Sequence, residues 1–257
     1  MEALRAALLD WYAAGARDLP WRRTRDPYAI LVSEVMLQQT QVARVVPRYE
    51  AWLERWPTAA VLAAAPRAEV LGEWVGLGYN RRALRLQEAC VVVARDGWPA
   101  DAAGLRALPG VGPYTAAAVA SFAWGERIAA VDVNVARVAA RVGRTPDELL
   151  ARDAPAWNQA MMELGATVCR ARSADCPRCP VVPWCASAGR VEVAARGTAT
   201  RPRFEDTNRW VRGRVVAALA AGDGLPEDIP AERLRIAVDG LVRDGLVVHG
   251  RLGLSLG

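Results

Sequence analysis

The chain of 257 residues is 53% hydrophobic and 24% charged, which allows a sizeable core and excludes an intrinsically disordered protein. Its apolar runs are short and interrupted, which excludes a membrane span. Its amphipathic N-terminus differs from a signal peptide. We therefore expect a cytoplasmic protein with no membrane partner. The net charge of +5 suits a polyanionic partner.

The basic residues restrict the possible chemistry. All 33 basic side chains are arginine, and the single histidine is His249 near the C-terminus. Catalysis through a Schiff base to lysine is therefore excluded. Proton transfer must rest on the side chains of Asp, Glu, Tyr or Cys.

Helical periodicity, broken by Pro and Gly, extends from the N-terminus to about residue 190 and predicts an all-α domain. Residues 191–206 lose this periodicity and are predicted to form a linker. Residues 207–257, the C-terminal module, are predicted to form two amphipathic helices and a short hairpin that turns at Gly250. This order indicates a small winged-helix-like module, and a packing appendage without DNA contact is the alternative.

Residues 29–41, AILVSEVMLQQTQ, are predicted to be one helix with a carboxylate on its apolar face. Ile30, Leu31 and Leu37 lie three or four positions from Glu34 and share that face. Because burial of an unpaired charge costs several kcal/mol or more, we expect Glu34 to be either paired or neutral.

The stretch LPGVGPYTAAAVA, residues 108–120, predicts a glycine turn between two helices. Gly110 and Gly112 allow a tight turn, and Pro113 suits the first position of the next helix. Backbone N–H groups at such a turn are suited to bind phosphate. Further along, Asp132 stands between an apolar run and a new helix, where an N-cap is expected.

Four cysteines lie within seventeen residues, at Cys169, Cys176, Cys179 and Cys185. Thiolates this close together indicate a soft metal centre, because disulfides are rare in a reducing compartment. A structural zinc site usually has two CxxC pairs, whereas this chain has one CxxC with a further cysteine on each side. Cys90, the fifth cysteine, is predicted to be a core residue.

The glycine turn, Asp132 and the four cysteines, in this order, resemble the helix-hairpin-helix DNA glycosylases of the endonuclease III superfamily, over residues 1 to about 190. Within that superfamily the most similar family is the MutY adenine DNA glycosylases, through the segments LPWR, DPY, SEVMLQQTQV, GLGY, LPGVGPYT, VDVNV and NQAMMELG. The resemblance implies a two-lobed fold, with a six-helix lobe over about residues 21–120 and a cluster lobe from about residues 1–20 and 121–190.

The resemblance also implies cofactors and a partner. The four cysteines would hold one [4Fe-4S] cluster, and the glycine turn would hold a monovalent cation. The partner would be double-stranded DNA with a mismatched or oxidised base pair, bound by a monomer that is associated with the nucleoid through DNA.

The resemblance further implies roles for individual residues. Glu34 would protonate adenine N7 and Asp132 would stabilise the oxocarbenium-like sugar, which parallels glycoside hydrolysis by two carboxyl groups. Glu34 then needs a raised pKa. Tyr114 occupies the position of the lysine of bifunctional relatives and would order the carboxylates, with Asn134 beside Asp132. The protein would be a monofunctional glycosylase of base excision repair that leaves an abasic site.

A flipped adenine needs a pocket that stacks it and reads its edge. The resemblance assigns this pocket to Trp21, Arg22, Leu37 and Gln159. Gln39 and Tyr79 would wedge into the base stack with Gln38 beside them; core packing is the alternative for Trp21, Leu37 and Tyr79. Other DNA contacts are expected at the glycine turn and in the cysteine loop, from Leu108, Gly110, Val111, Gly112, Arg170, Arg172 and Arg178.

About 70 residues follow the last cysteine, which is too few for the MutT-like domain with which longer relatives recognise 8-oxoguanine, given ordinary domains of about 100–150 residues. The expected substrate is adenine opposite 8-oxoguanine or guanine.

Two alternative functions remain. Asn80 replaces a second aromatic residue of many adenine glycosylases, so the first alternative is a thymine or uracil glycosylase acting on T:G or U:G. The string QQTQ and Gln159 weigh against it. A redox-sensing, non-catalytic DNA-binding regulator is the second alternative; the expected catalytic residues argue against it.

Overall fold

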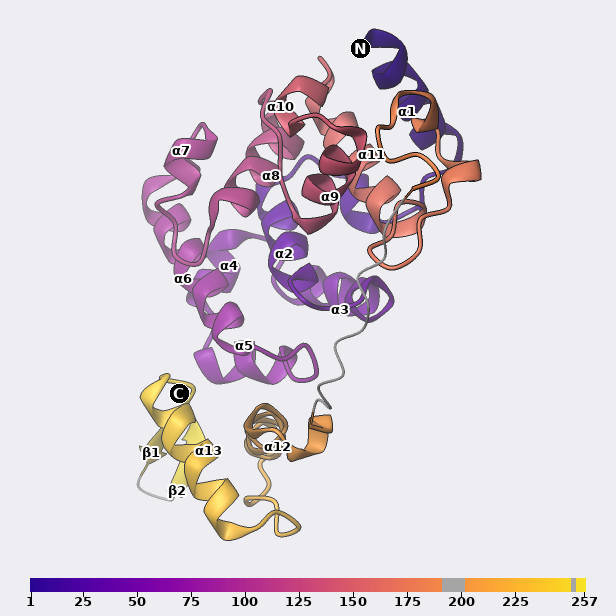
Figure 1. Ribbon diagram of the computed structural model, residues 1–257. Helices are drawn as coiled ribbons and strands as arrows, with labels where there is room; N and C mark the ends of the chain where they lie inside the picture. The colour runs from indigo at the N-terminus through magenta and orange to yellow at the C-terminus, as the bar shows by residue number, and fades with distance from the viewer. Residues whose placement is uncertain (191–201, 251–252) are drawn as a thin grey trace. The chain divides into compact units, whose positions relative to one another are not determined.

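The computed structural model describes residues 1–190, 202–250 and 253–257. Its helices, labelled in Figure 1, confirm the predicted all-α class. Contacts divide the chain into two compact units. Unit 1 comprises Met1–Glu34, Pro99–Ala107 and Val111–Gly197, and unit 2 comprises Val35–Trp98, Leu108–Gly110 and Thr198–Gly257. No helix in the described ranges is long and apolar enough to cross a membrane.

Unit 1 has its core between three helices. Helix α11 packs against both α1 and α9, and the buried side chains include Leu8, Val138 and Trp157. In α9 the buried residues recur every three or four positions, as the sequence pattern requires. The helices of this unit are α1 (Glu2–Gly15), α7 (Ala102–Leu105), α8 (Pro113–Trp124), α9 (Val133–Val142), α10 (Pro146–Leu149) and α11 (Ala154–Thr167), with short 3-10 turns η1 (Pro20–Arg22), η2 (Cys176–Arg178) and η3 (Val182–Trp184).

Helix α2 (Pro27–Leu37) is shorter than predicted, since the sequence pattern placed one helix over residues 29–41. It ends because Gln39 adopts a left-handed backbone conformation, with φ of 56°. The Arg82 side chain stabilises this end by donating hydrogen bonds to the carbonyl oxygens of Val35 and Gln38, at 2.6 and 2.8 Å. Gln38 and Gln39 therefore lie beyond the helix.

Unit 2 contains a cluster of tryptophans between its first helices. Trp52 lies 4.5 Å from Trp56 and 5.4 Å from Trp74 between ring centres, both in edge-to-face geometry. Cys90 is fully buried, as predicted for a core residue. The helices of this part are α3 (Val42–Arg55), α4 (Ala59–Ala64), α5 (Arg67–Glu73) and α6 (Arg81–Asp96).

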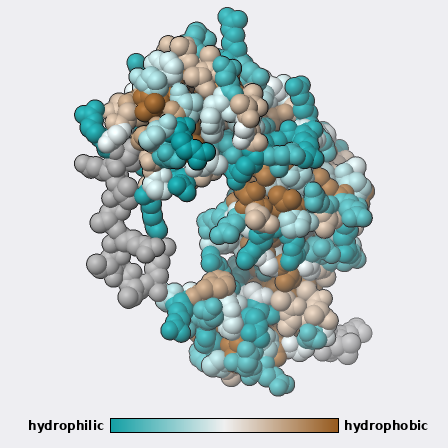
Figure 2. Space-filling view, turned by 90° about the vertical axis from the view of Figure 1, so that its right-hand side faces the viewer, coloured by the Kyte–Doolittle hydropathy of each residue, from teal (hydrophilic) through white to brown (hydrophobic). Residues whose placement is uncertain are grey.

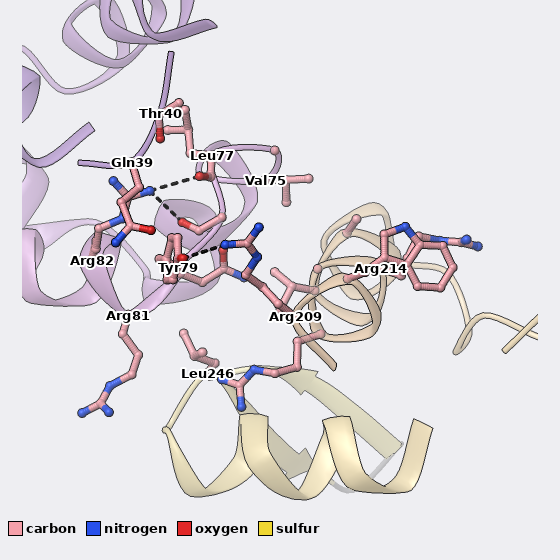
Figure 3. Close-up of a pocket in the computed structure, with 18 of the residues that line it drawn as sticks. Gln39, Thr40, Val75, Leu77, Tyr79, Arg81, Arg82, Arg209, Arg214 and Leu246 are labelled. Carbon is pink, nitrogen blue, oxygen red and sulfur yellow. Dashed lines mark hydrogen bonds between the residues drawn. The ribbon is translucent and has the colours of Figure 1, made fainter. Parts of the chain in front are cut away.

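The C-terminal module also belongs to unit 2. It consists of α12 (Asn208–Ala221), α13 (Ala231–Arg243) and an antiparallel hairpin of β1 (Val247–Gly250) and β2 (Gly253–Leu256). Val211, Ile229 and Ala237 form its small core. Helix α12 packs against α5, and a pocket lies between α12 and the loop before α6 (Figure 3).

Two helices and a hairpin agree with the predicted element order, and the winged-helix interpretation stays a prediction. The predicted linker falls largely on residues 191–201, outside the described residues, and a 3-10 turn η4 (Phe204–Asp206) precedes α12. The domain boundaries inferred from the sequence also stay predictions. On the face shown in Figure 2, hydrophilic side chains predominate and hydrophobic residues gather in small patches.

Candidate active site

Glu34 lies on the buried face of α2. The residue is only 5% exposed, and the preceding turn of the helix contributes the equally buried Ile30 and Leu31. Burial raises the pKa of Glu34 to about 7; a hydrogen bond from Tyr114 opposes this shift, and the negative charge of Asp132 adds to it. The side chain is therefore a carboxyl group that carries a proton for much of the time at neutral pH.

Tyr114, in the first turn of α8, is the direct neighbour of this carboxyl group. Burial and the charge of Glu34 raise the pKa of Tyr114 well above its usual value, so the phenol stays protonated and can donate. The Tyr114 hydroxyl also lies 3.8 Å from the sulfur of Met162. The predicted neighbourhood of Glu34, Tyr114 and Asp132 is thus present within unit 1.

Asp132 is the N-cap of α9. Its Oδ1 accepts hydrogen bonds from the backbone N–H groups of Asn134 and Val135, at 2.9 and 2.7 Å. The side-chain amide of Asn134 donates to Oδ2 at 2.7 Å. These three donors fix the carboxylate in one orientation, so the capping role expected from the sequence is compatible with a role in chemistry.

The start of α9 is held in place by α11. A Cβ added to Gly165 of α11 would lie 2.6 Å from the Cβ of Asn134, closer than any normal contact, so only glycine allows this approach. Arg137 joins the same two helices, since its Nη2 donates to Asn134 Oδ1 at 2.8 Å and to the Gly165 carbonyl at 2.7 Å. The position of the Asp132 cap therefore depends on the packing of α11.

Helix α9 also organises the cysteine loop. Nη1 of Arg141 donates to the carbonyl of Arg170 at 2.9 Å and lies 3.2 Å from the sulfur of Cys169. Sγ of Cys185 donates to the Arg141 carbonyl at 3.2 Å. Asp132 thus caps the start of α9, and Arg141, in the last turn of the same helix, orders the cysteine loop.

All five cysteines are free, and four of them line one pocket in unit 1: Cys169, Cys176, Cys179 and Cys185. In the described part of the chain, no three side chains of His, Cys, Asp or Glu are grouped closely enough to form a metal site as they stand. Four free thiols around a single pocket are nevertheless the donor set that an iron–sulfur cluster requires. Arg170, Arg172 and Arg178 are exposed on the same loop.

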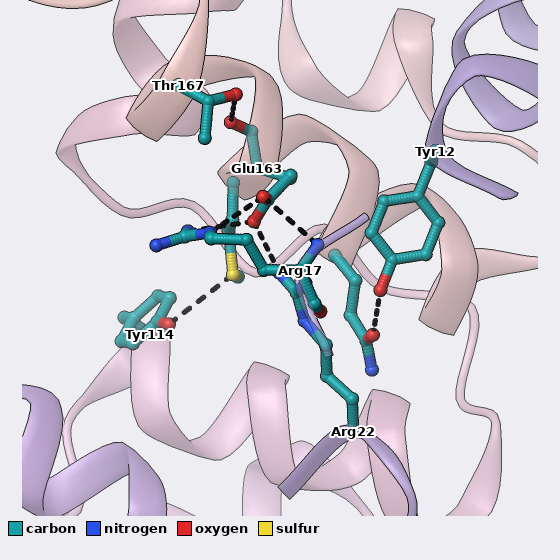
Figure 4. A network of polar contacts seen from close by, with 8 residues as sticks. Tyr12, Arg17, Arg22, Tyr114, Glu163 and Thr167 are labelled. Atoms are coloured by element: carbon teal, nitrogen blue, oxygen red, sulfur yellow. Dashed lines mark hydrogen bonds and ion pairs between the residues drawn. The ribbon is translucent and has the colours of Figure 1, made fainter. Parts of the chain in front are cut away.

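A second buried carboxylate lies on α11 (Figure 4). Glu163 is 2% exposed and accepts hydrogen bonds from Arg17 at 2.7 and 2.8 Å and from Arg22 at 2.8 Å. Burial raises the pKa of Glu163, but the two arginines outweigh it and hold the value below the ordinary one. Glu163 is consequently an ionised partner in a salt bridge.

This network positions two of the expected base-pocket residues. The Arg22 guanidinium carbon lies 5.3 Å from the centre of the Tyr12 ring, and the Tyr12 hydroxyl donates to the side-chain oxygen of Gln159. Sequence reasoning missed Tyr12, Arg17 and Glu163. The signal for Glu163 was an acid among apolar residues in NQAMMELG, the same signal that singled out Glu34.

The glycine turn has the geometry that the sequence predicted. Gly110 has a φ of 76°, and a Cβ there would lie 2.7 Å from the Cβ of Arg85. Gly112 is the N-cap of α8 and Pro113 the first residue, with no side chain capping this helix end. Leu108 and Val111 are buried and anchor the turn.

The remaining expected residues lie as follows. Trp21 is half-buried in η1 of unit 1, and Leu37 is half-buried at the end of α2. In unit 2, Gln39 and Tyr79 are exposed, and both have left-handed backbones, with φ of 56° and 48°. We call Gln39 and Tyr79 the wedge residues.

Comparison with known proteins identifies the family. The model of the HhH-GPD superfamily of base excision DNA repair proteins matches residues 32–161, a range that includes Glu34, Tyr114 and Asp132. The chain belongs to this superfamily. It is 44% identical over 281 residues to an adenine DNA glycosylase of Mycolicibacterium smegmatis, covering 96% of this chain and 94% of that protein. It is 45% identical over 219 residues to the human adenine DNA glycosylase, covering 74% of this chain and 40% of that protein.

Solved structures of HhH-GPD proteins agree with the fold. A thermostable thymine-DNA glycosylase matches with a TM-score of 0.69 at 28% identity, covering 74% of this chain and 97% of that one. A trapped endonuclease III–DNA covalent intermediate matches with a TM-score of 0.62 at 26% identity, covering 73% and 94%. The predicted helix-hairpin-helix fold is thereby confirmed.

Proposed function

We propose that this HhH-GPD protein is a monofunctional adenine DNA glycosylase that acts as a monomer in base excision repair and removes adenine opposite 8-oxoguanine or guanine. The observation that carries the proposal is the buried Glu34 carboxyl group, whose pKa is raised to about 7, beside Tyr114 and Asp132. The identities of 44% and 45% to adenine glycosylases support the choice of base.

In the proposed reaction, neutral Glu34 donates its proton to N7 of the extruded adenine. The bond between N9 and C1′ then breaks, and its electron pair leaves with the base. Asp132, oriented by the amides of α9, stabilises the positive charge on the sugar. Water adds to C1′ and its proton returns to Glu34, so the acid is regenerated and an abasic site remains.

The absence of lysine supports the monofunctional assignment, because the chain has no amine side chain that could attack C1′ and lead to strand cleavage. Tyr114 supplies a hydrogen-bond donor in its place. Arg22 and Gln159, which the salt bridge at Glu163 and the Tyr12 hydroxyl orient, are proposed to read the edge of the base.

We also propose that the four cysteines of the loop hold a [4Fe-4S] cluster. When bound, the cluster would cross-link the loop through four iron–sulfur bonds. The loop then presents Arg170, Arg172 and Arg178 to the phosphates of DNA, and Arg141 fixes its start through the Arg170 carbonyl. Iron and sulfide analysis of the purified protein tests this assignment: fewer than four iron atoms per chain after anaerobic reconstitution would contradict it.

The decisive experiment for the activity compares duplexes containing A:8-oxoguanine, A:G, T:G and U:G. Each is incubated with excess protein and treated with alkali, which breaks the strand at an abasic site. We expect breaks at adenine in the first two duplexes and no breaks before alkali. Breaks at thymine or uracil but not at adenine would establish the pyrimidine glycosylase instead, for which the match to the thymine-DNA glycosylase structure is the reason to test it. Binding without any break, in protein with intact cluster absorbance, would establish the regulator.

A further inference from the structure

One guanidinium joins the two loops that carry the wedge residues. The Arg82 side chain donates to carbonyl oxygens at the end of α2, just before Gln39. It also donates to two carbonyls just before Tyr79, and Figure 3 shows these bonds. Burial lowers the pKa of Arg82 to about 10, so it remains a cation at neutral pH. The five acceptors, at 2.6 to 3.3 Å, are the carbonyls of Val35, Met36, Gln38, Leu77 and Gly78.

A second arginine reaches Tyr79 from the C-terminal module. Nη1 of Arg209, in the first turn of α12, donates a hydrogen bond of 2.6 Å to the Tyr79 hydroxyl (Figure 3). The guanidinium carbon of Arg209 also lies 5.0 Å from the centre of the Tyr79 ring and 4.9 Å from that of Phe204. Arg82 lies 5.7 Å from the same Tyr79 ring. Two arginines thus contact the Tyr79 ring.

Three further arginines around this pocket form ion pairs with acids. Arg212 pairs with Asp244 at 2.5 Å, and Arg214 pairs with Asp228 at 2.8 Å. Arg81 of α6 lies 3.6 Å from Asp244, so an ion pair also links α6 to the module. The pair between Arg81 and Asp244, with the packing of α12 on α5, keeps the module against the helices that flank the Tyr79 loop.

The contact from Arg209 orients Tyr79 without hiding it. Tyr79 remains 43% exposed, and its left-handed backbone is a conformation that a non-glycine residue adopts only when its surroundings enforce it. We propose that the C-terminal module is a positioning element for the wedge, in which Arg209 holds the Tyr79 ring in the orientation that enters the base stack. This inference rests on the proposed function, and it gives the module a task that does not depend on reading a base.

A double-mutant cycle tests the proposal. The full chain carries Arg209→Met, Tyr79→Phe or both, and the DNA carries 2-aminopurine beside the target adenine as a fluorescent reporter of unstacking. If Arg209 acts through the Tyr79 hydroxyl, each single variant lowers the fluorescence rise and the single-turnover rate about three- to tenfold, and the double variant is no worse than either. Arg214→Met is the matched control, since it removes the same charge from the same helix without contact to Tyr79.

Three results would overturn the proposal. Additive losses in the double variant would mean that Arg209 does not act through Tyr79. A salt dependence of binding that weakens by about one counterion in Arg209→Met would make it a phosphate contact, since each phosphate contact contributes about 0.9 to the slope. A faster rate in Arg209→Met would mean that the contact holds Tyr79 back. The fluorescence and binding measurements can still be made if no base is excised from any duplex, a result that would refute the proposed function alone.

Discussion

Two carboxyl groups are buried to nearly the same degree in unit 1, and their pKa values shift in opposite directions. Glu34 is 5% exposed and Glu163 is 2% exposed. Glu34 has a phenol as its hydrogen-bonding neighbour, and its pKa rises to about 7. Glu163 has two guanidinium groups, and its pKa falls below the ordinary value. Burial alone therefore does not make an acid; the charge of the neighbours decides which carboxyl group can donate a proton.

The strongest test of this contrast is Glu34→Gln, which keeps the shape of the side chain and removes its proton. We expect the single-turnover excision rate to fall about 10²- to 10⁴-fold, the range that general acids contribute, with binding to the mismatched duplex retained. Quenched-flow assays with alkali treatment measure the rate. Glu50→Gln, an exposed carboxylate with the same change, serves as control. Near-normal excision by Glu34→Gln would remove this residue from catalysis.

The corresponding change at the other carboxylate, Glu163→Gln, should act on stability. It leaves the cations of Arg17 and Arg22 without their partner, and loss of one member of a buried pair costs about 3–5 kcal/mol. Because the side chain of Arg17 is 40% exposed, we expect the lower limit, ~3 kcal/mol of unfolding free energy in urea titrations. Glu69→Gln, which breaks an exposed pair with Arg55, should cost less than about 1 kcal/mol. Equal losses in the two variants would contradict the assignment.

The pH dependence should separate the two groups. The pKa of Glu34 is raised from 4.5 to about 7. The folding stability that its neutral form contributes is therefore fully present below pH 4.5 and is lost as the pH rises through 7. The pKa of Glu163 is lowered, so the folding stability that its ionised form contributes is present above the ordinary pKa of a glutamate and is lost on acidification. Excision should fall about fivefold between pH 7 and 8, as the protonated fraction of Glu34 declines. A rate that rises over this interval would contradict proton donation by Glu34.

The smallest effect is expected from Tyr114→Phe. The hydrogen bond from Tyr114 lowers the pKa of Glu34, so its removal raises that pKa and moves the falling limb of the pH–rate profile to higher pH. At pH 7 the rate should rise by no more than about twofold, because about half of the Glu34 carboxyl groups are already protonated there. A limb that moves to lower pH would show that Tyr114 acts in some other way.

Much of the site was predictable because its signals are local. Glu34 shares a helical face with apolar residues three and four positions away, and this spacing predicts its burial. Asp132 precedes an apolar helix, and the structure confirms it as the cap. The cysteines lie close together in the sequence, and they line one pocket. Each of these features depends on residues within about two helical turns or one loop of each other.

What the sequence could not predict depends on distant partners. Glu163 gives the same pattern as Glu34, an acid among apolar residues, and only the fold brings Arg17 and Arg22 to it from 146 and 141 positions away. The end of α2 was mispredicted for the same reason. No glycine or proline marks that point. The helix ends where Gln39 adopts a left-handed backbone conformation and where Arg82, 44 positions beyond Gln38, donates hydrogen bonds to the last carbonyl groups.

The close approach at Gly165 has a consequence for genetics. This residue has no side chain that could take part in the chemistry, yet any larger residue would push against Asn134 and move the first turn of α9. A random-mutagenesis screen that scores mutation rates in cells should therefore recover Gly165 substitutions among the loss-of-repair alleles, together with those at Asp132.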